Sequence, residues 1–449
     1  MAREPLHVVI LPWLAFGHMI PFFHLSSSLA KAGIRVSFIS TPRNIQRLPE
    51  IPAELEPLFN FVQFHLPSVD GLPIGAEATV DLTMDQTQFL KVSYDLMDTQ
   101  FKAFISKETV DWIILDFAPY WAVDIAREKS IPLIMFSVLS SVINAFFGHP
   151  DFLTAEEQKD RTWESLTSPP KWITFPSTVA FRPFEAKVIF LGVFETNASA
   201  KTDAERMSEM LNACQAVAMR TCKEYEGEYF DVATKVYRQA VIPVGLIPPV
   251  LVEKDRDNVE GHSSGEIFNW LDLQKNRSVV YVAFGSEAKL DRDQVFQIAH
   301  GLELADLPFL WALRKPMWAI DDDDALPSGF RSRTARFGVV AFGWVPQLDI
   351  LSHPSIGGSL FHSGWGSIIE TLQHGHTLVV LPLVIDQGLN ARLLVEKGLA
   401  VEVERTDDGK FNGEDIAKAL RMAMVSNEGE DLRLRARDMK SIFSDQGQL

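Results

Sequence analysis

The chain contains few cysteines and no long apolar run. Cys214 and Cys222 are the only cysteines among 449 residues, and no metal-ligand partner lies near them in the sequence. We therefore expect a reducing compartment and no disulfide framework. A membrane-spanning helix needs roughly 18 or more consecutive apolar residues. The best candidate, Val8–Leu29, is interrupted by polar and helix-breaking residues, so no membrane span is expected. The interruptions are Gly17, His18, Pro21 and His24.

Positive charge is also scarce. There are 42 Lys and Arg residues against 59 Asp and Glu residues, a formal net charge of −17. Such a chain is a poor partner for nucleic acid or for an anionic membrane. A phosphate-bearing ligand must then be held by local dipoles, because the overall field repels it. Met1–Pro5 carries two charges and leads directly into a strand-like segment, so we expect no signal peptide and a cytoplasmic location.

The order of elements favours an α/β fold with large cores, which the apolar share of 47% can supply. The first 40 residues read as a strand at His7–Pro12, a loop at Gly17–Pro21, a helix up to Ala32 and a strand at Ile34–Ser40. This order is a βαβ unit. The pattern G-x-G-x-x-G, typical of dinucleotide-binding proteins, does not occur here.

The same alternation continues beyond two loop-rich stretches at 43–80 and 150–200 and predicts two doubly wound domains facing a cleft. Proline clusters followed by a charged stretch mark the boundary. We expect a first domain at 1–240, a linker at 241–260 and a second domain at 261–449. The expected strands are 111–116, 131–136, 216–221, 278–285, 308–313, 338–342, 358–361, 377–382 and 401–403, and the expected helices are 88–105, 120–129, 202–211, 295–302, 388–396 and 412–423.

The stretch from Trp344 to Gln387 is unusually rich in Trp, His, Asp, Glu, Gln and Gly. Its two short apolar runs, at 358–361 and 377–382, read as buried parallel strands. Between them, Ser363–Ser367 opens a helix that carries Glu370. A glycine-containing turn at a helix start leaves backbone N–H groups free to face an anion. A phosphate site, a nearby carboxylate and an indole together predict a nucleotide pocket.

This stretch closely resembles the C-terminal signature box of plant family 1 glycosyltransferases, which use UDP-sugars. One position departs from the box, since Gly366 stands where the family usually has Asn. Glycine there resembles the subgroup that extends sugar chains on glycosylated plant metabolites. The resemblance implies the two-domain GT-B type fold. The matching residues are Trp344, Pro346, Gln347, His353, Gly357, His362, Gly364, Trp365, Ser367, Glu370, Pro382, Asp386 and Gln387.

The resemblance also implies a role for each residue of the donor site. The roles divide by the part of the UDP-sugar that is held, namely uracil, ribose, diphosphate and transferred sugar. Uracil is expected to contact Trp344 and Val345, and the ribose Gln347 and Glu370. The diphosphate is expected to contact Ser286, His362, Ser367 and the backbone at Gly364, Trp365 and Gly366. The transferred sugar is expected to contact Trp365, Asp386 and Gln387. It further implies a C-terminal helix that packs back on the first domain, and we expect this helix to lie beyond Leu449.

Two residues at strand ends are candidates for acid–base chemistry. His18 follows the first strand in an expected loop, and Asp116 ends the strand at 111–116. Loops at the carboxyl ends of parallel strands are where such sheets bind ligands. A carboxylate that accepts from one imidazole nitrogen leaves the other nitrogen basic. Either residue alone could be structural, but both match the family, which implies that His18 is the base and Asp116 its orienting partner. His24 lies inside the helix and reads as structural.

Apolar residues near the expected base favour a flat or polycyclic acceptor. Phe16, Phe117, Tyr120 and Phe146 are the candidates to line its site, although Phe146 could equally be ordinary core. The resulting hypothesis is an inverting, metal-independent, monomeric UDP-sugar transferase with no cofactor beyond its co-substrate. UDP-glucose is the expected donor, with UDP-rhamnose as an alternative. A glycoside of a flavonoid or terpenoid is the expected acceptor.

Several other interpretations of the sequence are open or disfavoured. A relative that glucosylates aglycones or phenolic xenobiotics directly remains open, as does a non-catalytic nucleotide-sugar binding protein. The match of Gly261–Gly265 to G-x-S-x-G lacks the strand that a nucleophile elbow needs, so a hydrolase is disfavoured. The aspartates at Asp321–Asp324 read as a solvated loop rather than a metal site. The sequons at Asn197 and Asn276 have no meaning without secretion.

Overall fold

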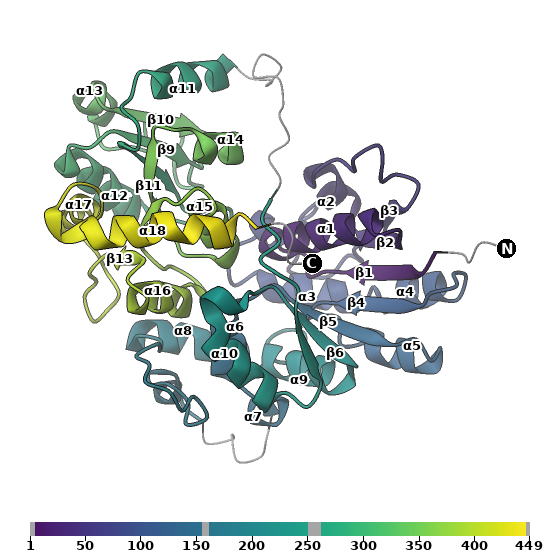
Figure 1. The fold of residues 1–449 in the computed structure, drawn as a ribbon. Coiled ribbons are helices and arrows are strands. Elements are labelled where there is room, and N and C mark those ends of the chain that lie inside the picture. The colour runs from purple at the N-terminus through teal and green to yellow at the C-terminus, as the bar shows by residue number, and fades with distance from the viewer. Residues whose placement is uncertain (1–4, 155–160, 250–261, 446–449) are drawn as a thin grey trace. The chain divides into compact units, whose positions relative to one another are not determined.

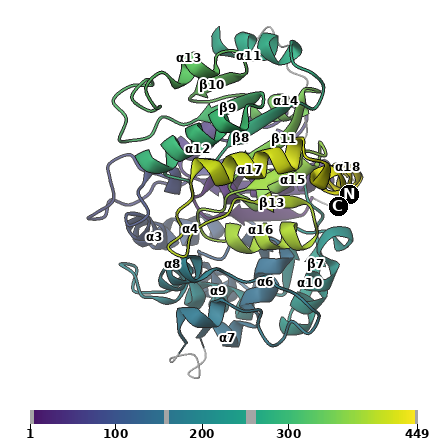
Figure 2. The ribbon, with the colours of Figure 1, turned by 90° about the vertical axis from the view of Figure 1, so that its left-hand side faces the viewer.

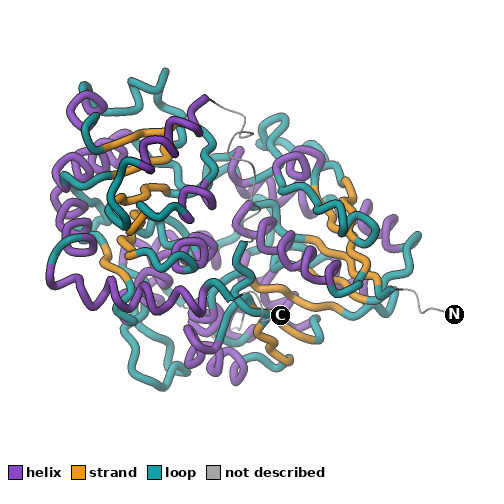
Figure 3. Tube along the Cα trace, turned by 45° about the horizontal axis from the view of Figure 1, so that its top comes forward, coloured by secondary structure: helices purple, strands orange, loops and turns teal. Residues whose placement is uncertain are grey.

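The computed structural model describes residues 5–154, 161–249 and 262–445, and its contacts divide the chain into two units (Figure 1). Unit 1 contains Met1–Pro176 and Lys187–Ile247, and unit 2 contains Ser177–Ala186 and Pro248–Asp445. Each unit is an α/β domain in which helices flank a parallel sheet (Figure 3). The predicted fold class, two Rossmann-like domains, is therefore confirmed. Among the described residues, no helix combines the length and apolar character that crossing a membrane requires.

The sheet of unit 1 has seven parallel strands in the order β3-β2-β1-β4-β5-β6-β7. Its central strands are short and almost wholly buried, as expected for strands covered on both faces. The strands are β1 (His7–Leu11), β2 (Arg35–Ser40), β3 (Phe59–Gln63), β4 (Trp112–Leu115), β5 (Leu133–Ser137), β6 (Ala216–Met219) and β7 (Ala240–Pro243).

Helices connect these strands. One of them, α9, begins with a capping box in which the side chains of Thr202 and Glu205 satisfy each other's backbone N–H groups. The helices are α1 (Phe16–Lys31), α2 (Pro42–Arg47), α3 (Thr87–Asp95), α4 (Asp98–Ile105), α5 (Ala122–Glu128), α6 (Ser141–Phe147), α7 (Pro150–Thr154), α8 (Pro183–Phe194), α9 (Asp203–Ala213) and α10 (Lys223–Val236).

The sheet of unit 2 has six parallel strands in the order β10-β9-β8-β11-β12-β13. Figure 2 shows α12, α16 and α17 in front of this sheet. The strands are β8 (Val279–Ala283), β9 (Phe309–Leu313), β10 (Gly338–Phe342), β11 (Ile356–Phe361), β12 (Thr377–Val380) and β13 (Ala400–Glu402), and the helices are α11 (His262–Asp272), α12 (Arg292–Ala305), α13 (Phe330–Thr334), α14 (Gln347–Ser352), α15 (Trp365–Leu372), α16 (Gln387–Glu396), α17 (Gly413–Met424) and α18 (Glu430–Phe443).

Both sheets reverse their strand order at one point. In unit 1 the chain moves outward from β1 to β2 and β3, then returns to place β4 on the other side of β1. In unit 2 it moves from β8 to β9 and β10, then returns to place β11 beside β8. A crevice opens at the carboxyl ends of the strands where the order reverses, and ligands of such folds bind there.

Several details differ from the sequence prediction. The stretch at 43–80 contains α2 and the edge strand β3, and 430–443 forms α18, none of which was predicted. β7 extends the first sheet beyond residue 240, and Ser177–Ala186 belongs to unit 2 rather than to the first domain. Residues 250–260 of the predicted linker lie outside the described residues. The region after residue 445 also lies outside the described residues, so the expectation about the family's C-terminal helix stays a prediction.

Candidate functional site

His18 and Asp116 lie in contact at the reversal point of the first sheet. β1 and β4 are neighbours and end in register, Leu11 opposite Leu115, so the segments that follow them start side by side. The Nδ1 atom of His18 is 2.7 Å from Oδ2 of Asp116. The His18 side chain is 19% exposed, whereas that of Asp116 is only 3% exposed. A partly accessible imidazole held by a buried carboxylate is the base-and-orienter geometry predicted from the sequence.

The carboxylate of Asp116 is held by backbone donors as well. The N–H of Trp13 donates to Oδ2 over 3.0 Å, and the N–H of Phe117 donates to Oδ1 over 2.7 Å. One correction concerns His18, which lies in the first turn of α1 and not in a loop, because the helix begins at Phe16. The helix start therefore fixes the backbone of His18 more firmly than a loop would.

The four predicted acceptor-site residues fall into different environments. Phe16 begins α1 and is partly buried, and the ring of Phe117 is centred 5.8 Å from that of His18. Phe146 is 2% exposed and packs edge-on against Phe147, which fits the alternative of ordinary core. The ring of Tyr120 lies under two cations, with Lys201 Nζ 4.1 Å and the Arg206 guanidinium carbon 4.9 Å from its centre. An acceptor role for these residues remains a prediction.

His24, the competing histidine, lies one and a half turns further along α1. Burial, followed by the charge of Arg220, lowers its pKa to about 4. Its Nδ1 atom is buried without a hydrogen-bond partner among the described residues. His24 therefore stays neutral at working pH and has the environment of a structural residue, as expected.

In unit 2 the predicted phosphate site lies at the reversal point of the second sheet. β8 and β11 are neighbours, with Ala283 opposite Phe361, so the turns that follow them meet. A Cβ added to Gly285 would lie 2.7 Å from Cε1 of His362, and one added to Gly364 would lie 2.7 Å from its Nε2. Both glycines thus leave space that the imidazole fills. Burial, partly offset by the Ala283 backbone, lowers the pKa of His362 to about 4, so it is a neutral donor.

The turn after β11 presents the start of α15. Ser363 adopts a left-handed backbone (φ 60°), and its hydroxyl donates to the carbonyls of His362 and Gln387. Gly364 is the N-cap of α15, and Trp365, Gly366 and Ser367 form the first turn. The first N–H groups of a helix have no intrahelical acceptor, and the helix dipole favours negative charge there. Ser286 lies in the facing turn after β8, and its carbonyl accepts from Arg314.

The residues predicted to hold uracil and ribose differ in their exposure and contacts. Trp344 is 77% exposed, whereas Val345 is 9% exposed and packs in a core cluster of unit 2. Gln347 donates from Nε2 to Oε2 of Glu370 over 2.6 Å. Its Oε1 accepts from the hydroxyl of Tyr281 over 3.2 Å. An amide and a carboxylate side by side suit two vicinal hydroxyls.

The predicted sugar-binding residues are partly engaged within the protein. Trp365 is 4% exposed with its ring edge-on to Phe443 of α18, so we expect it to contribute through its backbone. Oε1 of Gln387 accepts from the N–H groups of Leu383 and Val384, both over 2.9 Å. The amide of Asn390 donates to Oδ2 of Asp386 over 2.8 Å.

Sequence reasoning missed two residues of this site. Asn390 bridges Asp386 and the carbonyl of Ser363, 3.2 Å away, and Tyr281 supports Gln347. Asn390 follows Asp386 by one helical turn, a spacing that brings side chains together and could have identified it. Tyr281 is one of several apolar residues in a buried strand, so no local signal distinguishes it.

The described surroundings of the G-x-S-x-G match and of the aspartate run do not support a catalytic or metal-binding role. His262 begins the helix α11, without a strand described before it, and Gly261 lies outside the described residues. The side chain of Asp321 accepts from the N–H groups of Asp323 and Asp324 in an exposed turn. Within the described ranges, no group of three or more His, Cys, Asp or Glu side chains is arranged to hold a metal ion.

Two parallel sheets, each with one reversal of strand order, define the fold class as the two-domain GT-B type. The family model for UDP-glucuronosyl and UDP-glucosyl transferases matches residues 259–436. The chain is 40% identical over 447 residues to soyasaponin III rhamnosyltransferase of Glycine max, covering 98% of this chain and 92% of that protein. The chain belongs to the UDP-glycosyltransferase family.

Two further likenesses agree with this assignment. Anthocyanidin-3-O-glucoside rhamnosyltransferase of Petunia hybrida is 34% identical over 446 residues, covering 98% of this chain and 92% of that protein. The crystal structure of TcCGT1 in complex with UDP superposes with a TM-score of 0.78 at 22% identity, covering 99% of this chain and 96% of that one. At this identity the superposition supports the fold, and the sequence relatives support the family.

Proposed function

We propose that this enzyme transfers a sugar from a UDP-sugar to an acceptor hydroxyl with inversion at the anomeric carbon. Nε2 of His18 removes the proton of the hydroxyl as its oxygen attacks the anomeric carbon from the face opposite UDP. A glycosidic bond forms, the bond from that carbon to the diphosphate oxygen breaks, and UDP leaves with the electron pair. Asp116 stabilises the imidazolium that His18 becomes.

The leaving diphosphate is stabilised by fixed dipoles. The first N–H groups of α15 and the neutral imidazole of His362 supply donors at the reversal point of the second sheet. Preorganised donors of this kind stabilise developing negative charge without reorganising. We therefore propose that no metal ion takes part. Turnover in EDTA should equal turnover without it, and a loss restored by Mg²⁺ or Mn²⁺ would overturn this part of the proposal.

The observation that carries the proposal is the 2.7 Å contact between His18 and Asp116. A non-catalytic nucleotide-sugar binding protein would have no use for a basic imidazole oriented by a buried carboxylate. Free UDP formed from a mixture of donor and acceptor distinguishes the two functions. A binding protein would release none.

We further propose that the acceptor is a glycoside of a hydrophobic plant metabolite, such as a flavonoid or terpenoid, and that the product contains a sugar–sugar bond. Gly366 leaves space and a bare backbone N–H where a polar side chain would otherwise face the donor sugar. The names of both relatives describe transfer to compounds of this kind. Direct transfer to an aglycone is the alternative.

For the donor we propose UDP-glucose, because Asp386 and Gln387 can hold ring hydroxyls. UDP-rhamnose is the second candidate, because both relatives are named as rhamnosyltransferases. Both questions are answered by one experiment with a flavonol and its 3-O-glucoside, each assayed with either donor at equal concentration. We expect faster transfer to the glucoside, with the new linkage on its sugar by NMR. Faster transfer to the flavonol itself would refute the acceptor proposal.

The proposed setting is the cytoplasm, and the proposed state is a monomer. Cys214 and Cys222 are buried free thiols, and burial raises the pKa of each, to about 11 and about 12. Unreactive reduced thiols of this kind fit a reducing compartment. Light scattering of the purified chain would report its mass, and a fluorescent fusion would report its location.

A further inference from the structure

The end of α3 contacts both segments that carry the proposed catalytic pair. The hydroxyl of Tyr94 donates to the carbonyl of Pro12 over 2.9 Å, and its ring meets Trp13 edge-on with centres 5.3 Å apart. Trp13 is the residue whose N–H donates to Asp116. Tyr94 is fully buried, and burial, followed by the charges of Asp116 and Asp95, raises its pKa well above the usual value. It therefore remains a donor at any working pH.

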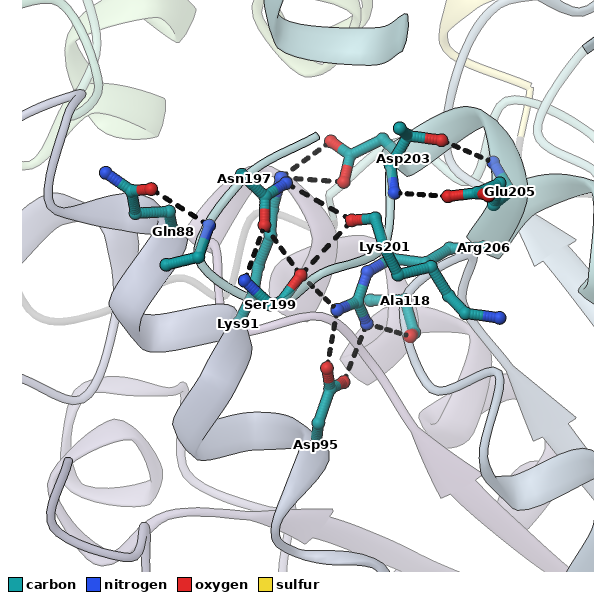
Figure 4. A network of polar contacts seen from close by, with 12 residues as sticks. Gln88, Lys91, Asp95, Ala118, Asn197, Ser199, Lys201, Asp203, Glu205 and Arg206 are labelled. Atoms are coloured by element: carbon teal, nitrogen blue, oxygen red, sulfur yellow. Dashed lines mark hydrogen bonds and ion pairs between the residues drawn. The ribbon is translucent and has the colours of Figure 1, made fainter. Parts of the chain in front are cut away.

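The neighbouring residue, Asp95, reaches the other segment through Arg206 of α9. Two nitrogens of the Arg206 guanidinium contact the two carboxylate oxygens of Asp95, at 2.7 and 2.5 Å. One of these nitrogens also donates to the carbonyl of Ala118 over 3.0 Å. Ala118 stands two residues after Asp116. Figure 4 shows the Arg206 side chain between Asp95, Ala118 and Ser199.

Arg206 is itself rigidly placed. Its side chain has no exposed area, and the Tyr120 ring lies against its guanidinium. Nearby, Lys91 of α3 pairs with Asp203 at the start of α9, with contacts of 2.6 and 2.8 Å (Figure 4). A planar guanidinium with several fixed donors can hold a carboxylate and a carbonyl at once, which an ammonium group cannot do in the same geometry.

We propose that Tyr94, Asp95 and Arg206 are positioning residues for the His18–Asp116 pair, an inference that rests on the proposed function. Tyr94 fixes the segment after β1, and the Asp95–Arg206 pair fixes the segment after β4. The two loops then hold the 2.7 Å contact between imidazole and carboxylate. None of the three residues touches the reacting atoms. Catalysis is sensitive to small displacements of a base, which can cost about 100-fold in rate.

The test compares the full-length enzyme with Tyr94→Phe, Arg206→Lys and the control Tyr237→Phe. Tyr237 is also buried in unit 1, and its hydroxyl lies 3.2 Å from the side chain of Asn144, away from both segments. With UDP-glucose and a flavonol 3-O-glucoside, we expect kcat to fall about 10- to 100-fold in the first two variants. KM for the donor and the affinity for UDP should not change, and the control should keep the kcat of the wild type.

If the three residues only stabilised the fold, the substitutions would lower the melting temperature without these kinetic effects. Two further measurements distinguish a positioning role from a structural one. In ¹⁵N-histidine-labelled enzyme, the low-field Nδ1–H signal that disappears in His18→Ala should shift or broaden in Tyr94→Phe but not in Tyr237→Phe. In an Asp116→Asn background, Tyr94→Phe should cause little additional loss. The inference would be overturned if the Nδ1–H signal were unchanged in Tyr94→Phe, or if Tyr94→Phe lowered kcat as much in the Asp116→Asn background as in the wild type. Both results rest on Tyr94→Phe, so they hold even if Arg206→Lys fails to fold.

Failure of this inference can be separated from failure of the proposed function. If His18→Ala is inactive while Tyr94→Phe and Arg206→Lys turn over like the wild type, the positioning role is wrong and the base assignment stands. If His18→Ala turns over normally, the proposed mechanism itself is wrong.

Discussion

At the scale of single residues, burial sets the behaviour of the histidines. Burial is the largest cause lowering the pKa of His24, His362 and His374, each to about 4. His18, by contrast, is partly exposed and contacts a carboxylate. One residue type therefore occurs here as a neutral core group, as a neutral hydrogen-bond donor and as the proposed base. The surroundings of each ring, which sequence does not show, decide among these roles.

The lowered pKa of His24 predicts a loss of stability in acid. In the unfolded chain a histidine takes up a proton below about pH 6.5, whereas in the folded chain His24 does so only near pH 4. Its contribution is therefore complete above about pH 6.5 and is lost as the pH falls towards 4. Between pH 7.5 and 5, this one residue should cost about 2 kcal/mol of unfolding free energy.

His24→Leu removes this proton uptake while keeping an apolar side chain in the core. Urea unfolding at both pH values should then show a smaller loss in the variant than in the wild type. An equal loss in both proteins would mean that His24 does not titrate as its burial implies.

At the scale of elements, the start of α15 is the feature most sensitive to a small change. Gly364→Ala would place a methyl group 2.7 Å from Nε2 of His362 and displace the imidazole from the proposed phosphate site. Overpacking of this kind costs about 1–3 kcal/mol, so we expect UDP to bind about 10- to 100-fold more weakly by calorimetry. Gly265→Ala is the control, because nothing lies within 4 Å of a Cβ there and alanine favours a helix.

If Gly364→Ala binds UDP as tightly as the wild type, His362 does not contact the diphosphate. A matching loss in Gly265→Ala would instead indicate a general effect on unit 2 rather than a local one.

Most buried strands were predictable from sequence, whereas the edge strand β3 and the charged helix α18 were not. β1, β11 and β12 are unbroken buried runs, and their ends place His18 and His362 by the strand-end rule. β3 reads Phe-Asn-Phe-Val-Gln and lies at the edge of its sheet, so it gives no continuous apolar run. Half of the residues in α18 are charged and few are buried, which hides its helical period.

At the scale of the whole molecule, the segment Ser177–Ala186 belongs to unit 2, although the residues before and after it in the sequence belong to unit 1. Within unit 2, Glu185 pairs with Arg392, and Arg392 also contacts Glu402 over 2.8 Å. Glu185 and Arg392 are 207 residues apart. Contacts at that separation leave no periodic pattern in the sequence. For the same reason the Tyr281–Gln347 and Arg206–Ala118 bonds could not be predicted, although the residue types of the site could.

Because this network is buried, we expect two arginine substitutions to lower the free energy of unfolding by different amounts. The Arg392 side chain is 11% exposed, as is that of Glu185, so Arg392→Met removes the buried partner of Glu185, while Glu402 keeps its pair with Arg182 over 3.0 Å. Breaking a buried pair in this way costs about 3–5 kcal/mol. Arg336→Met breaks the exposed pair with Asp306, where the side chains are 74% and 57% exposed, and should cost at most about 1 kcal/mol. Urea unfolding of both variants measures the difference, and equal losses would refute the role of the network.

The role of His18 as the base is tested by measuring the turnover of His18→Ala together with its affinity for UDP. His24→Gln, changed on the same helix, is the matched control. We expect His18→Ala to bind UDP with the affinity of the wild type while UDP release from the donor and acceptor falls about 100- to 10,000-fold, and we expect His24→Gln to retain most of its turnover. Normal turnover by His18→Ala would show that His18 is not the base.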